Sequence, residues 1–435
     1  MAINAYIMMN RQKFIKTSTL LAASALFFKR TKVLGDSKKI RIGVIGVNGM
    51  GWSNLTAILK NTNVVCTALC DIDENVLNNR VSELKKRDIN VKTYIDYKQL
   101  LADNNVDAVI IGTPDHWHCL MMVDAVTAGK HVYVEKPIGN SIKECELMVA
   151  AAQKYNAIVQ VGQWQRSQQH FEDAMKFLHA GSLGKVRMVK VWAYLGWKKD
   201  VPIVPDSAIP AGVHYDRWLG PATKRPFNVN RFHFNFRWFW DYAGGLMTDW
   251  GVHMLDFALI GMKVSDPRSI MAAGGKFAYP DDVEETPDTL TTLYEFDGFN
   301  VQWEHAIGID GGPYNKGHGV AFIGNNGTLV LNRQGWEVLP EGDRMAAVPF
   351  QKSKDNGLER HMDNFVEAIV TRNKSILKAP VEAGAHIAIL SQMGNIAYRT
   401  GKKLYWDKDK RQFSDKDANK YLAANYHNGY SYPKV

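Results

Sequence analysis

The chain has 435 residues, of which 46% are hydrophobic and 22% charged, enough for a sizeable core and for more than one domain. Its formal net charge is +9, but residues 1–35 contain six basic residues and no acidic one, which leaves only +3 for the remainder. So small an excess, without a basic run in that remainder, argues against a nucleic-acid-binding protein, and four cysteines are too few for a disulfide scaffold.

An apolar stretch at residues 17–28 lies between basic residues and is too short to span a membrane, which is the layout of an export signal. Residues 10–16 resemble the twin-arginine export motif, with Gln12 where the second arginine would stand. We therefore expect residues 1–35 to be a leader that sends the protein to the periplasm, by the twin-arginine or the general secretion route. We expect no membrane span in the mature chain. The alternative is a disordered or amphipathic N-terminal tail.

Short apolar runs then alternate with helical patterns. The runs expected to be buried strands are Ile42 to Ile45, Val64 to Cys70, Val106 to Ile111, His131 to Val134 and Ile158 to Val161. The helices expected between them lie near residues 52–60, 74–87, 118–128 and 142–155. This alternation predicts an α/β fold that begins with a Rossmann domain, a doubly wound parallel sheet covered on both faces by helices, over residues 36–161.

The pattern changes past Gly162. A helix near 168–180, a strand at 186–194, a Trp-rich segment at 201–240 and a helix near 248–261 precede long alternating strands at 289–296, 301–305 and 327–331. Long strands separated by turns predict a C-terminal α/β domain with a large, open, mainly antiparallel sheet. We expect residues 162–435 to form this second domain, which would bind substrate and carry the contacts between subunits.

A glycine-rich turn follows the first expected strand and precedes the first expected helix, where backbone N–H groups can bind pyrophosphate. Gly46 and Gly51 take the first and third positions of the G-x-G-x-x-G spacing, and Asn48, a residue type that tolerates left-handed backbone, takes the second. Asp71 ends the next strand, where a carboxylate accepts hydrogen bonds from the adenosine ribose and repels a 2′-phosphate, so NAD is favoured over NADP. The alternative is an ordinary tight turn with a surface aspartate. The residues expected to border this part of the cofactor are Gly46, Asn48, Gly49, Met50, Gly51 and Asp71.

Two further motifs follow buried strands, the segment from Thr113 to His118 and the run Glu135-Lys136-Pro137. The carboxyl ends of parallel strands are the edge at which open α/β sheets bind ligands. The ammonium of Lys136, placed beside a nicotinamide, would orient a substrate hydroxyl and stabilise the oxygen that becomes a carbonyl. The alternative for an isolated Lys-Pro pair is a surface turn.

Asp249 and His253 are four residues apart, so they would share one face of the helix predicted near 248–261. An imidazole with a pKa near 6.5 suits the removal of a proton from a sugar hydroxyl while hydride leaves the same carbon. Asp249 would hold the ring or bind a neighbouring hydroxyl. The alternative is an ion pair on the surface of a helix.

Four motifs in this order resemble the Gfo/Idh/MocA oxidoreductase family: the glycine loop, Thr-Pro-Asp-His-Trp-His, Glu-Lys-Pro, and the helix Gly-Gly-x-x-x-Asp-x-x-x-His. The resemblance extends from about residue 38 to the C-terminus, since residues 394–399 also look like the family. It implies a Rossmann domain, a C-terminal α/β domain with a large open sheet, and a site in the cleft between them.

The same resemblance implies that Lys136, Asp249 and His253 are the catalytic residues, and that the bond between Lys136 and Pro137 is a candidate for cis geometry. It also implies a homo-oligomer, a dimer or a tetramer, formed through the exposed face of the second sheet. The residues that would border the nicotinamide end of NAD are Thr113, Pro114, His116, His118, Glu135 and Lys136.

The segment 232–242 combines many aromatic side chains with a few polar groups just ahead of the catalytic helix, which fits a carbohydrate site. Aromatic faces stack on the C–H surfaces of sugar rings, although each aromatic taken singly is also explained by core packing or a subunit interface. No compact metal-ligand spacing occurs, so we expect no metal. The candidate substrate-binding residues are Trp164, Arg166, His233, Arg237, Trp238, Tyr242 and His305.

Together these features predict an exported NAD-dependent oxidoreductase that oxidises a ring hydroxyl of a sugar or glycoside, with C3 as the expected carbon, to a keto-sugar. Because no abundant soluble NAD is to be assumed outside the cytoplasm, the cofactor would be held tightly and a second sugar would take the hydride back. One alternative is an NAD-dependent glycosidase that acts by transient C3 oxidation and elimination, with Tyr242 or His305 as its extra acid-base group. Another is a non-catalytic sugar-binding protein that retains the Rossmann fold.

Overall fold

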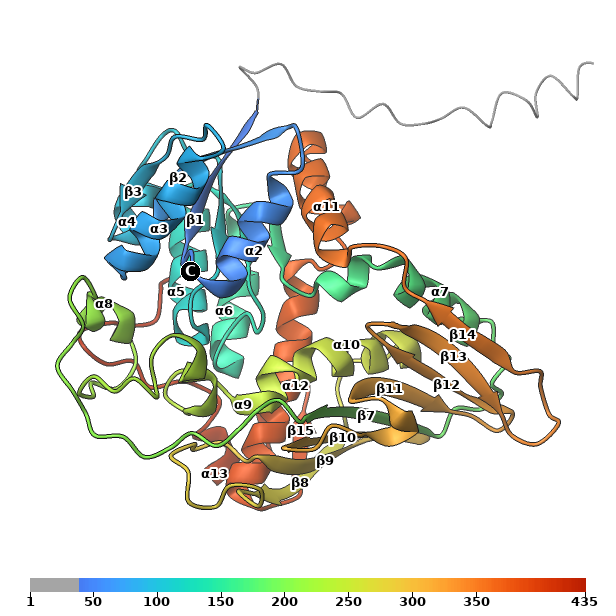
Figure 1. Cartoon of the computed structure of the whole chain (residues 1–435). Helices are drawn as coiled ribbons and strands as arrows, with labels where there is room; N and C mark the ends of the chain where they lie inside the picture. Colours follow the sequence, from blue (N-terminus) through green and yellow to red (C-terminus); the bar gives the residue numbers. More distant parts are fainter. Residues whose placement is uncertain (1–38) are drawn as a thin grey trace, which may run out of the picture. The chain divides into compact units, whose positions relative to one another are not determined.

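The computed structural model describes residues 39–435, and the expected leader at residues 1–35 lies outside the described residues. Residues Ile40–Val435 form one unit, which contains both expected domains (Figure 1). None of the helices in the described part of the chain is long and apolar enough to cross a membrane.

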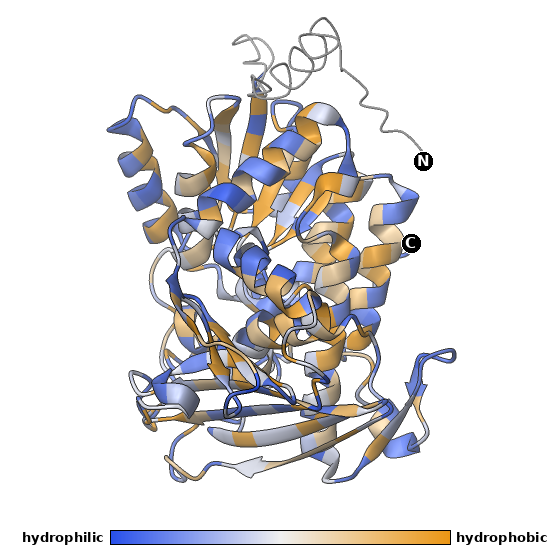
Figure 2. Cartoon of the chain, turned by 90° about the vertical axis from the view of Figure 1, so that its right-hand side faces the viewer, coloured by the Kyte–Doolittle hydropathy of each residue, from blue (hydrophilic) through white to orange (hydrophobic). Residues whose placement is uncertain are grey.

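The first sheet has six parallel strands in the order β3-β2-β1-β4-β5-β6, as the alternating pattern predicts. Its central strands are mostly apolar and buried because helices cover both faces, and Figure 2 shows much of this sheet in the hydrophobic colour. The strand order changes direction between β1 and β4. The strands are β1 (Ile40–Ile45), β2 (Val64–Cys70), β3 (Lys92–Tyr94), β4 (Ala108–Ile111), β5 (His131–Val134) and β6 (Val159–Val161).

The covering helices begin at the residue types that favour a helix start. Asp73 accepts the backbone N–H groups of residues 75 and 76 at the start of α3, and Ser141 accepts that of Glu144 at the start of α6, a capping-box pairing. Strand β3 and helix α4 were not predicted, because three-residue and five-residue elements carry no clear periodicity. The helices are α2 (Gly49–Ile58), α3 (Glu74–Lys85), α4 (Tyr97–Leu101), α5 (His118–Thr127) and α6 (Ile142–Lys154).

The second sheet is ten-stranded, in the order β14-β13-β12-β11-β7-β10-β9-β8-β15-β16. Only the pairing of β7 with β10 is parallel, so the predicted mainly antiparallel sheet is confirmed. Its strands mix hydrophobic and polar residues, in contrast to the first sheet (Figure 2). The strands are β7 (Met188–Leu195), β8 (Ser269–Gly275), β9 (Thr289–Phe296), β10 (Phe299–Ile307), β11 (His318–Ile323), β12 (Gly327–Asn332), β13 (Gly335–Pro340), β14 (Val348–Lys352), β15 (Leu404–Asp407) and β16 (Gln412–Phe413).

Helices α7 (Gln169–His179), α10 (Gly251–Met262) and α12 (Val381–Thr400) pack against this sheet (Figure 1). The helix predicted near 248–261 is in fact two helices, because one residue lies between the end of α9 (Gly245–Asp249) and the start of α10. Trp250 separates them with φ −95° and ψ −34°. Asp249 is therefore the last residue of α9, and His253 lies in the first turn of α10.

The chain crosses back from the second domain to the first. Helix α11 (Gly357–Thr371) lies beside the Rossmann sheet in Figure 1, and its Met362 and Phe365 belong to the same hydrophobic cluster as Ile42 and Leu55. The Rossmann core thus includes a helix from beyond residue 162, which a boundary at residue 161 leaves out. Helical periodicity alone does not say which sheet an amphipathic helix covers.

Candidate functional site

A cavity of about 470 Å³ runs along the carboxyl edge of the first sheet, where the strand order changes direction. Open α/β sheets bind ligands at this place. Both domains and the C-terminal tail contribute to its wall. The sequence-predicted residues on the wall are Gly46, Asn48, Gly49, Met50, Asp71, Thr113, Pro114, Glu135, Lys136, His233, Arg237 and Asp249.

The glycine loop lies at the wall of this cavity and leads into α2. Gly46 and Gly49 have left-handed backbone, with φ of +79° and +43°. Asn48 has extended backbone instead, and its side chain accepts the N–H of Gly49 at 3.0 Å, so the left-handed position expected at Asn48 falls at Gly49. A Cβ on Gly51 would lie 1.8 Å from the carbonyl oxygen of Gly46. The helix start is thus packed against the loop, an arrangement that suits pyrophosphate.

The carboxylate of Asp71, on the cavity wall, accepts two hydrogen bonds from backbone N–H groups. It accepts the N–H of Val47 at 2.8 Å and the N–H of Asp73 at 3.0 Å. Each carboxylate oxygen keeps a second lone pair, which a ribose hydroxyl can use. Further along the wall, the hydroxyl of Thr113 is buried without a hydrogen-bond partner. These residues fit a bound dinucleotide, with its adenosine at Asp71 and its nicotinamide toward Thr113.

An ion pair joins the two domains at the nicotinamide end. Lys136 follows β5, and its Nζ donates to Oδ1 of Asp249 at 2.5 Å and to the carbonyl oxygen of Asp249 at 3.2 Å. The peptide bond between Lys136 and Pro137 is cis, as the resemblance implied. Glu135 lies beneath the lysine, where it accepts from the side chain of Asn54 at 2.8 Å and from the backbone N–H of Lys136 at 3.2 Å.

Burial and charge act on the two remaining catalytic candidates in different ways. Burial alone would raise the pKa of Asp249, but the cations of Lys136 and Arg237 lower it to about 2. Burial lowers the pKa of His253 well below its usual value, and the charges of Lys136 and Arg333 lower it further. Asp249 is therefore ionised and His253 neutral near pH 7, and a neutral imidazole can take a proton.

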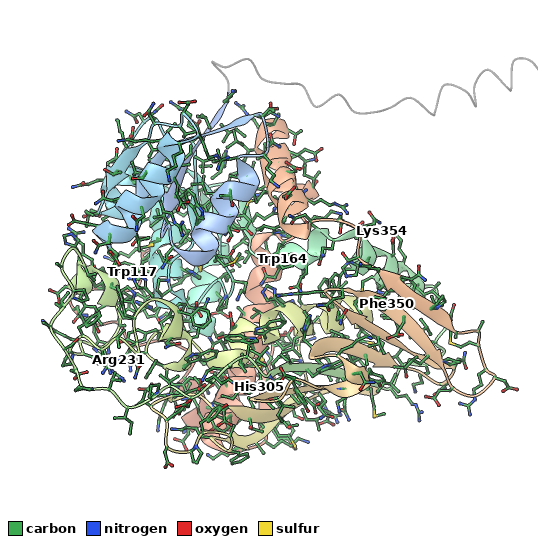
Figure 3. All side chains as sticks on the ribbon, in the orientation of Figure 1. Trp117, Trp164, Arg231, His305, Phe350 and Lys354 are labelled. Carbon is green, nitrogen blue, oxygen red and sulfur yellow. The ribbon has the colours of Figure 1, made fainter. Side chains whose placement is uncertain are left out.

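His253 is buried, and its Nδ1 has no hydrogen-bond partner among the described residues. Its ring packs against Trp164, with centroids 6.4 Å apart. Figure 3 places Trp164 between the Rossmann layer and the large sheet. Arg237, another predicted residue, lies over Phe234 and Phe236 and brings its Nε to 3.5 Å from Oδ1 of Asp249.

The structure places several predicted substrate residues away from the cavity wall. His305 is buried in the large sheet and contacts the carbonyl oxygen of Pro287 at 3.0 Å (Figure 3). Tyr242 and Trp238 are core residues with 0% and 1% of their surface exposed. Arg166 forms a 2.5 Å ion pair with Asp256. Their side chains were indistinguishable from ligand-binding ones in the sequence, because aromatic and basic residues serve both purposes.

Two predicted cofactor residues, His116 and His118, lie behind the wall and hold its loops. His116 Nε2 contacts the carbonyl oxygen of Trp218 at 3.0 Å. His118 contacts the carbonyl oxygens of Pro137 at 2.7 Å and Thr113 at 2.9 Å, so it ties the two nicotinamide-end loops together. His233 lies at the opposite end of the cavity from that expected. Asn48 donates to its Nδ1 at 3.4 Å, and its Nε2 donates to Asp73 at 3.0 Å.

Sequence analysis expected the loop from Thr113 to His118 at the site without singling out Asp115 and Trp117, and it missed Arg217 and Tyr430, which come from elsewhere in the chain. All four lie on the cavity wall. Asp115 stands within the Thr-Pro-Asp-His motif, so the motif itself was the signal. Burial raises its pKa to about 8. Arg217 pairs with Asp96 at 2.9 Å, and Tyr430 packs edge-on against Trp117 at 5.4 Å. No local pattern marks Arg217 or Tyr430.

Comparison with known proteins gives two family matches. The model of the Gfo/Idh/MocA oxidoreductase family, NAD-binding Rossmann fold, matches residues 40–163, and that of the C-terminal alpha/beta domain of this oxidoreductase family matches residues 172–432. A glycosyl hydrolase family 109 protein of Shewanella sp. (strain ANA-3) is 31% identical over 120 residues, which are 26% of this chain and 26% of that relative. The chain thus matches about a quarter of the length of such curated relatives.

Solved structures share the fold. Aldose-aldose oxidoreductase from Caulobacter crescentus superposes with a TM-score of 0.62 and 19% identity, covering 84% of this chain and 99% of that one. UDP-N-acetylglucosamine 3-dehydrogenase from Acidithiobacillus ferrooxidans does so with a TM-score of 0.59 and 17% identity, covering 83% and 99%. At these identities the likeness concerns the fold alone.

Gly51→Ala is expected to weaken NAD binding about 100-fold or more, because the new methyl group would collide with the carbonyl oxygen of Gly46 and displace the loop. Gly311→Ala is the matched control, since a Cβ there meets nothing within 4 Å. Calorimetric titration with NAD measures the affinities, and circular dichroism checks the fold. Equal affinities in the two variants would contradict the role given to the loop.

The pH dependence follows from the lowered pKa of His253. Because the base must be neutral, kcat/KM should stay high below the usual histidine pKa near 6.5 and fall only when the pH drops through the lower pKa of the folded protein. Arg333→Gln removes one of the cations that lower this pKa, so the acid limb of the profile should move to higher pH. An acid limb that does not move, or moves to lower pH, would show that Arg333 does not act on His253.

Proposed function

The chain belongs to the Gfo/Idh/MocA family of oxidoreductases, and from this premise we propose that it uses NAD to oxidise a ring hydroxyl of a sugar or glycoside to a ketone. The observation that carries the proposal is the ion pair of Lys136 with Asp249, 2.5 Å long, at the nicotinamide end of the cavity. It assembles an ammonium, a carboxylate and, in the next helical turn, a neutral imidazole. Those are the groups that removal of a proton and a hydride from one CH–OH group requires.

Each residue has a distinct part in the proposed reaction. The ammonium of Lys136 donates to the substrate hydroxyl and stabilises negative charge on its oxygen as the carbonyl forms. His253 takes the hydroxyl proton, and Asp249 holds the ammonium of Lys136 in position beside the reacting carbon. NAD, when bound, accepts the hydride. Thr113 and the Glu135–Lys136 loop would hold its nicotinamide, and Asp71 its adenosine ribose, with NAD favoured over NADP because Asp71 would repel a 2′-phosphate.

A tightly held cofactor is part of the proposal, and contacts across the cavity support it. The segment 201–240 of the second domain bonds to the ribose-side edge of the first at several points. His214 pairs with Glu74 at 2.8 Å and Arg217 with Asp96 at 2.9 Å, while His233 links Asn48 to Asp73. These contacts would have to break before the cofactor could dissociate. A second sugar would then return the hydride, a scheme that the fold shared with aldose-aldose oxidoreductase supports.

The carbon we propose is C3, which is the position named for one enzyme of the same fold, UDP-N-acetylglucosamine 3-dehydrogenase. We also propose a periplasmic location, on the strength of residues 1–35, and a homo-oligomer assembled through the large sheet. Cell fractionation tests the first of these two points and light scattering the second. A cytoplasmic protein, or a monomer at all concentrations, would overturn the corresponding point.

Purified protein should carry NAD through dialysis and release it on denaturation. His233→Ala is expected to lose NAD about 30-fold faster, because two hydrogen bonds across the cavity disappear, at about 1 kcal/mol each. His179→Ala is the control, since His179 lies on α7 and contacts only carbonyl oxygens of residues 260 and 261. NAD in the supernatant is measured enzymatically. Wild-type protein that contains no NAD after dialysis and exchanges added NAD freely would contradict tight binding of the cofactor.

His253→Ala should lower turnover of sugars about 100- to 10,000-fold, the usual contribution of a general base. Mass spectrometry of keto products from a panel of sugars and glycosides provides the measurement, and it also identifies the oxidised carbon. Thermal unfolding of the variant serves as the control for folding. Unchanged turnover would remove the catalytic role and favour the non-catalytic sugar-binding protein instead.

A second candidate function is an NAD-dependent glycosidase, which needs one more acid-base group. Tyr242 and His305 are buried away from the cavity, but Asp115 lies on its wall with a pKa of about 8, so it holds a proton at neutral pH. The match to a glycosyl hydrolase family 109 protein points the same way. Release of the aglycone from a chromogenic glycoside, lost in Asp115→Asn, would favour this function. Formation of a keto-glycoside with its aglycone still attached would favour the dehydrogenase.

A further inference from the structure

A third cation, which the proposed reaction does not use, lies at the catalytic end of the site. Arg333 occupies the turn between β12 and β13 of the large sheet. Its guanidinium lies 4.4 Å from the ring centroid of Trp250 and 5.1 Å from that of Trp164. Trp250 follows Asp249 directly, and Trp164 packs against His253. The two indoles therefore hold Arg333 beside both catalytic side chains.

This cation has no carboxylate of its own among residues 39–435. Asp249 is the acidic group whose charge acts on Arg333, and Asp249 already pairs with Lys136 at 2.5 Å and lies 3.5 Å from Arg237. Asp249 thus interacts with all three cations. The Nε atom of Arg333 is buried without a hydrogen-bond partner, and burial lowers the pKa of the guanidinium to about 10.

Other buried cations in the second domain are paired. Arg166 binds Asp256 through two short contacts of 2.5 and 2.6 Å, and Lys198 binds Glu284 at 2.7 Å. Such pairing is the rule, because an uncompensated charge away from water is costly. Arg333, which is partly buried against Trp164 and Trp250, departs from that rule.

Unpartnered polar groups surround the same two indoles. Gln163, which precedes Trp164 at the end of β6, is 1% exposed, and neither its amide nitrogen nor its amide oxygen has a partner. The ring of His318 lies 4.8 Å from that of Trp250, and its Nε2 is also buried and unpaired. These polar atoms are therefore available to a ligand or to water.

We propose that the sugar oxidised here carries a carboxylate, as a uronic acid or its glycoside does, and that Arg333 is the residue that binds it. This inference rests on the proposed function and adds the class of substrate. The planar guanidinium offers two parallel N–H donors to a carboxylate, and its stacking on the indole rings fixes the orientation of these donors. The bound anion compensates the buried charge, whereas a neutral sugar leaves it unpaired. Gln163 and His318 are then available to the remaining hydroxyls.

The test uses matched pairs of methyl glycosides that differ only at C6, a glucoside with a glucuronide and a galactoside with a galacturonide. Reduction of the enzyme-bound NAD is followed by its absorbance. Wild-type kcat/KM should favour the acid of the preferred pair about 10- to 100-fold, the worth of one charge-assisted hydrogen-bonded contact. Arg333→Gln should lower kcat/KM for the acid by the same factor and change that for the neutral partner less than about threefold. Arg333→Lys should retain part of the preference.

Arg344→Gln is the matched control, because it removes the same charge from an exposed turn of the same sheet and should change neither substrate. Binding is measured separately by tryptophan fluorescence, since Trp164 and Trp250 flank Arg333. Glucuronate or galacturonate should alter the emission of wild type and not that of Arg333→Gln.

Three results would overturn the inference. The first is a kcat/KM for the neutral sugars that equals or exceeds that for the acids, and the second is a preference for sugar phosphates over uronides. The third is an equal loss of kcat/KM for both members of a pair in Arg333→Gln, together with a lower Tm, because that result would mark a packing role for Arg333. In each of these the enzyme still oxidises some sugar, so the proposed function survives. Failure of every sugar to reduce bound NAD or to alter the fluorescence would overturn both.

Discussion

The ion pair between Lys136 and Asp249 is the interaction on which the arrangement of the site depends. It joins the loop after β5 in the Rossmann domain to the last residue of α9 in the second domain. Both partners are mostly buried, with 12% and 20% of their side-chain surface exposed, so loss of either would leave an uncompensated charge. The pair thus links the two domains at this end of the cavity, helps to keep Asp249 ionised, and places an ammonium near His253.

The break between α9 and α10 gives that ion pair its geometry. A single helix would present Asp249 and His253 on one face. Here Trp250 lies between two helices, so Asp249 is the last residue of α9 and His253 lies in the first turn of α10. The carboxylate therefore reaches across to the Rossmann loop, while the imidazole packs on Trp164. No hydrogen bond joins the carboxylate of Asp249 to the imidazole of His253 in the described part of the chain, and Nδ1 of the imidazole has no partner there.

Charge is distributed unevenly between the structural and the catalytic parts of the second domain. Where an ion pair serves the fold, as with Arg166 and Asp256, each charge has its own partner at short range. At the catalytic end Lys136, Arg237 and Arg333 lie around Asp249. Burial raises the pKa of Asp115 to about 8, so this acid carries little negative charge near neutral pH. Burial, together with the charges of Lys136 and Arg333, lowers the pKa of His253, and the same positive charge favours the anionic substrate that we propose. One electrostatic feature thus bears on both the base and the specificity.

The sequence by itself determined the parts of this protein that depend on neighbouring residues. Runs of apolar residues in β1, β4 and β5 predicted strands buried on both faces, and the spacing of Gly46, Gly51 and Asp71 predicted a nucleotide loop, because strand burial and helix-start chemistry are local. Family motifs named Lys136, Asp249 and His253. Only the tertiary structure decided that α11 completes the Rossmann core and that Tyr242 and His305 are buried. It also decided that Tyr430 reaches the cavity wall and that Arg333 packs on Trp164 and Trp250. Those contacts join residues far apart in the chain, so they follow from sheet order and packing, which no local pattern of residues encodes.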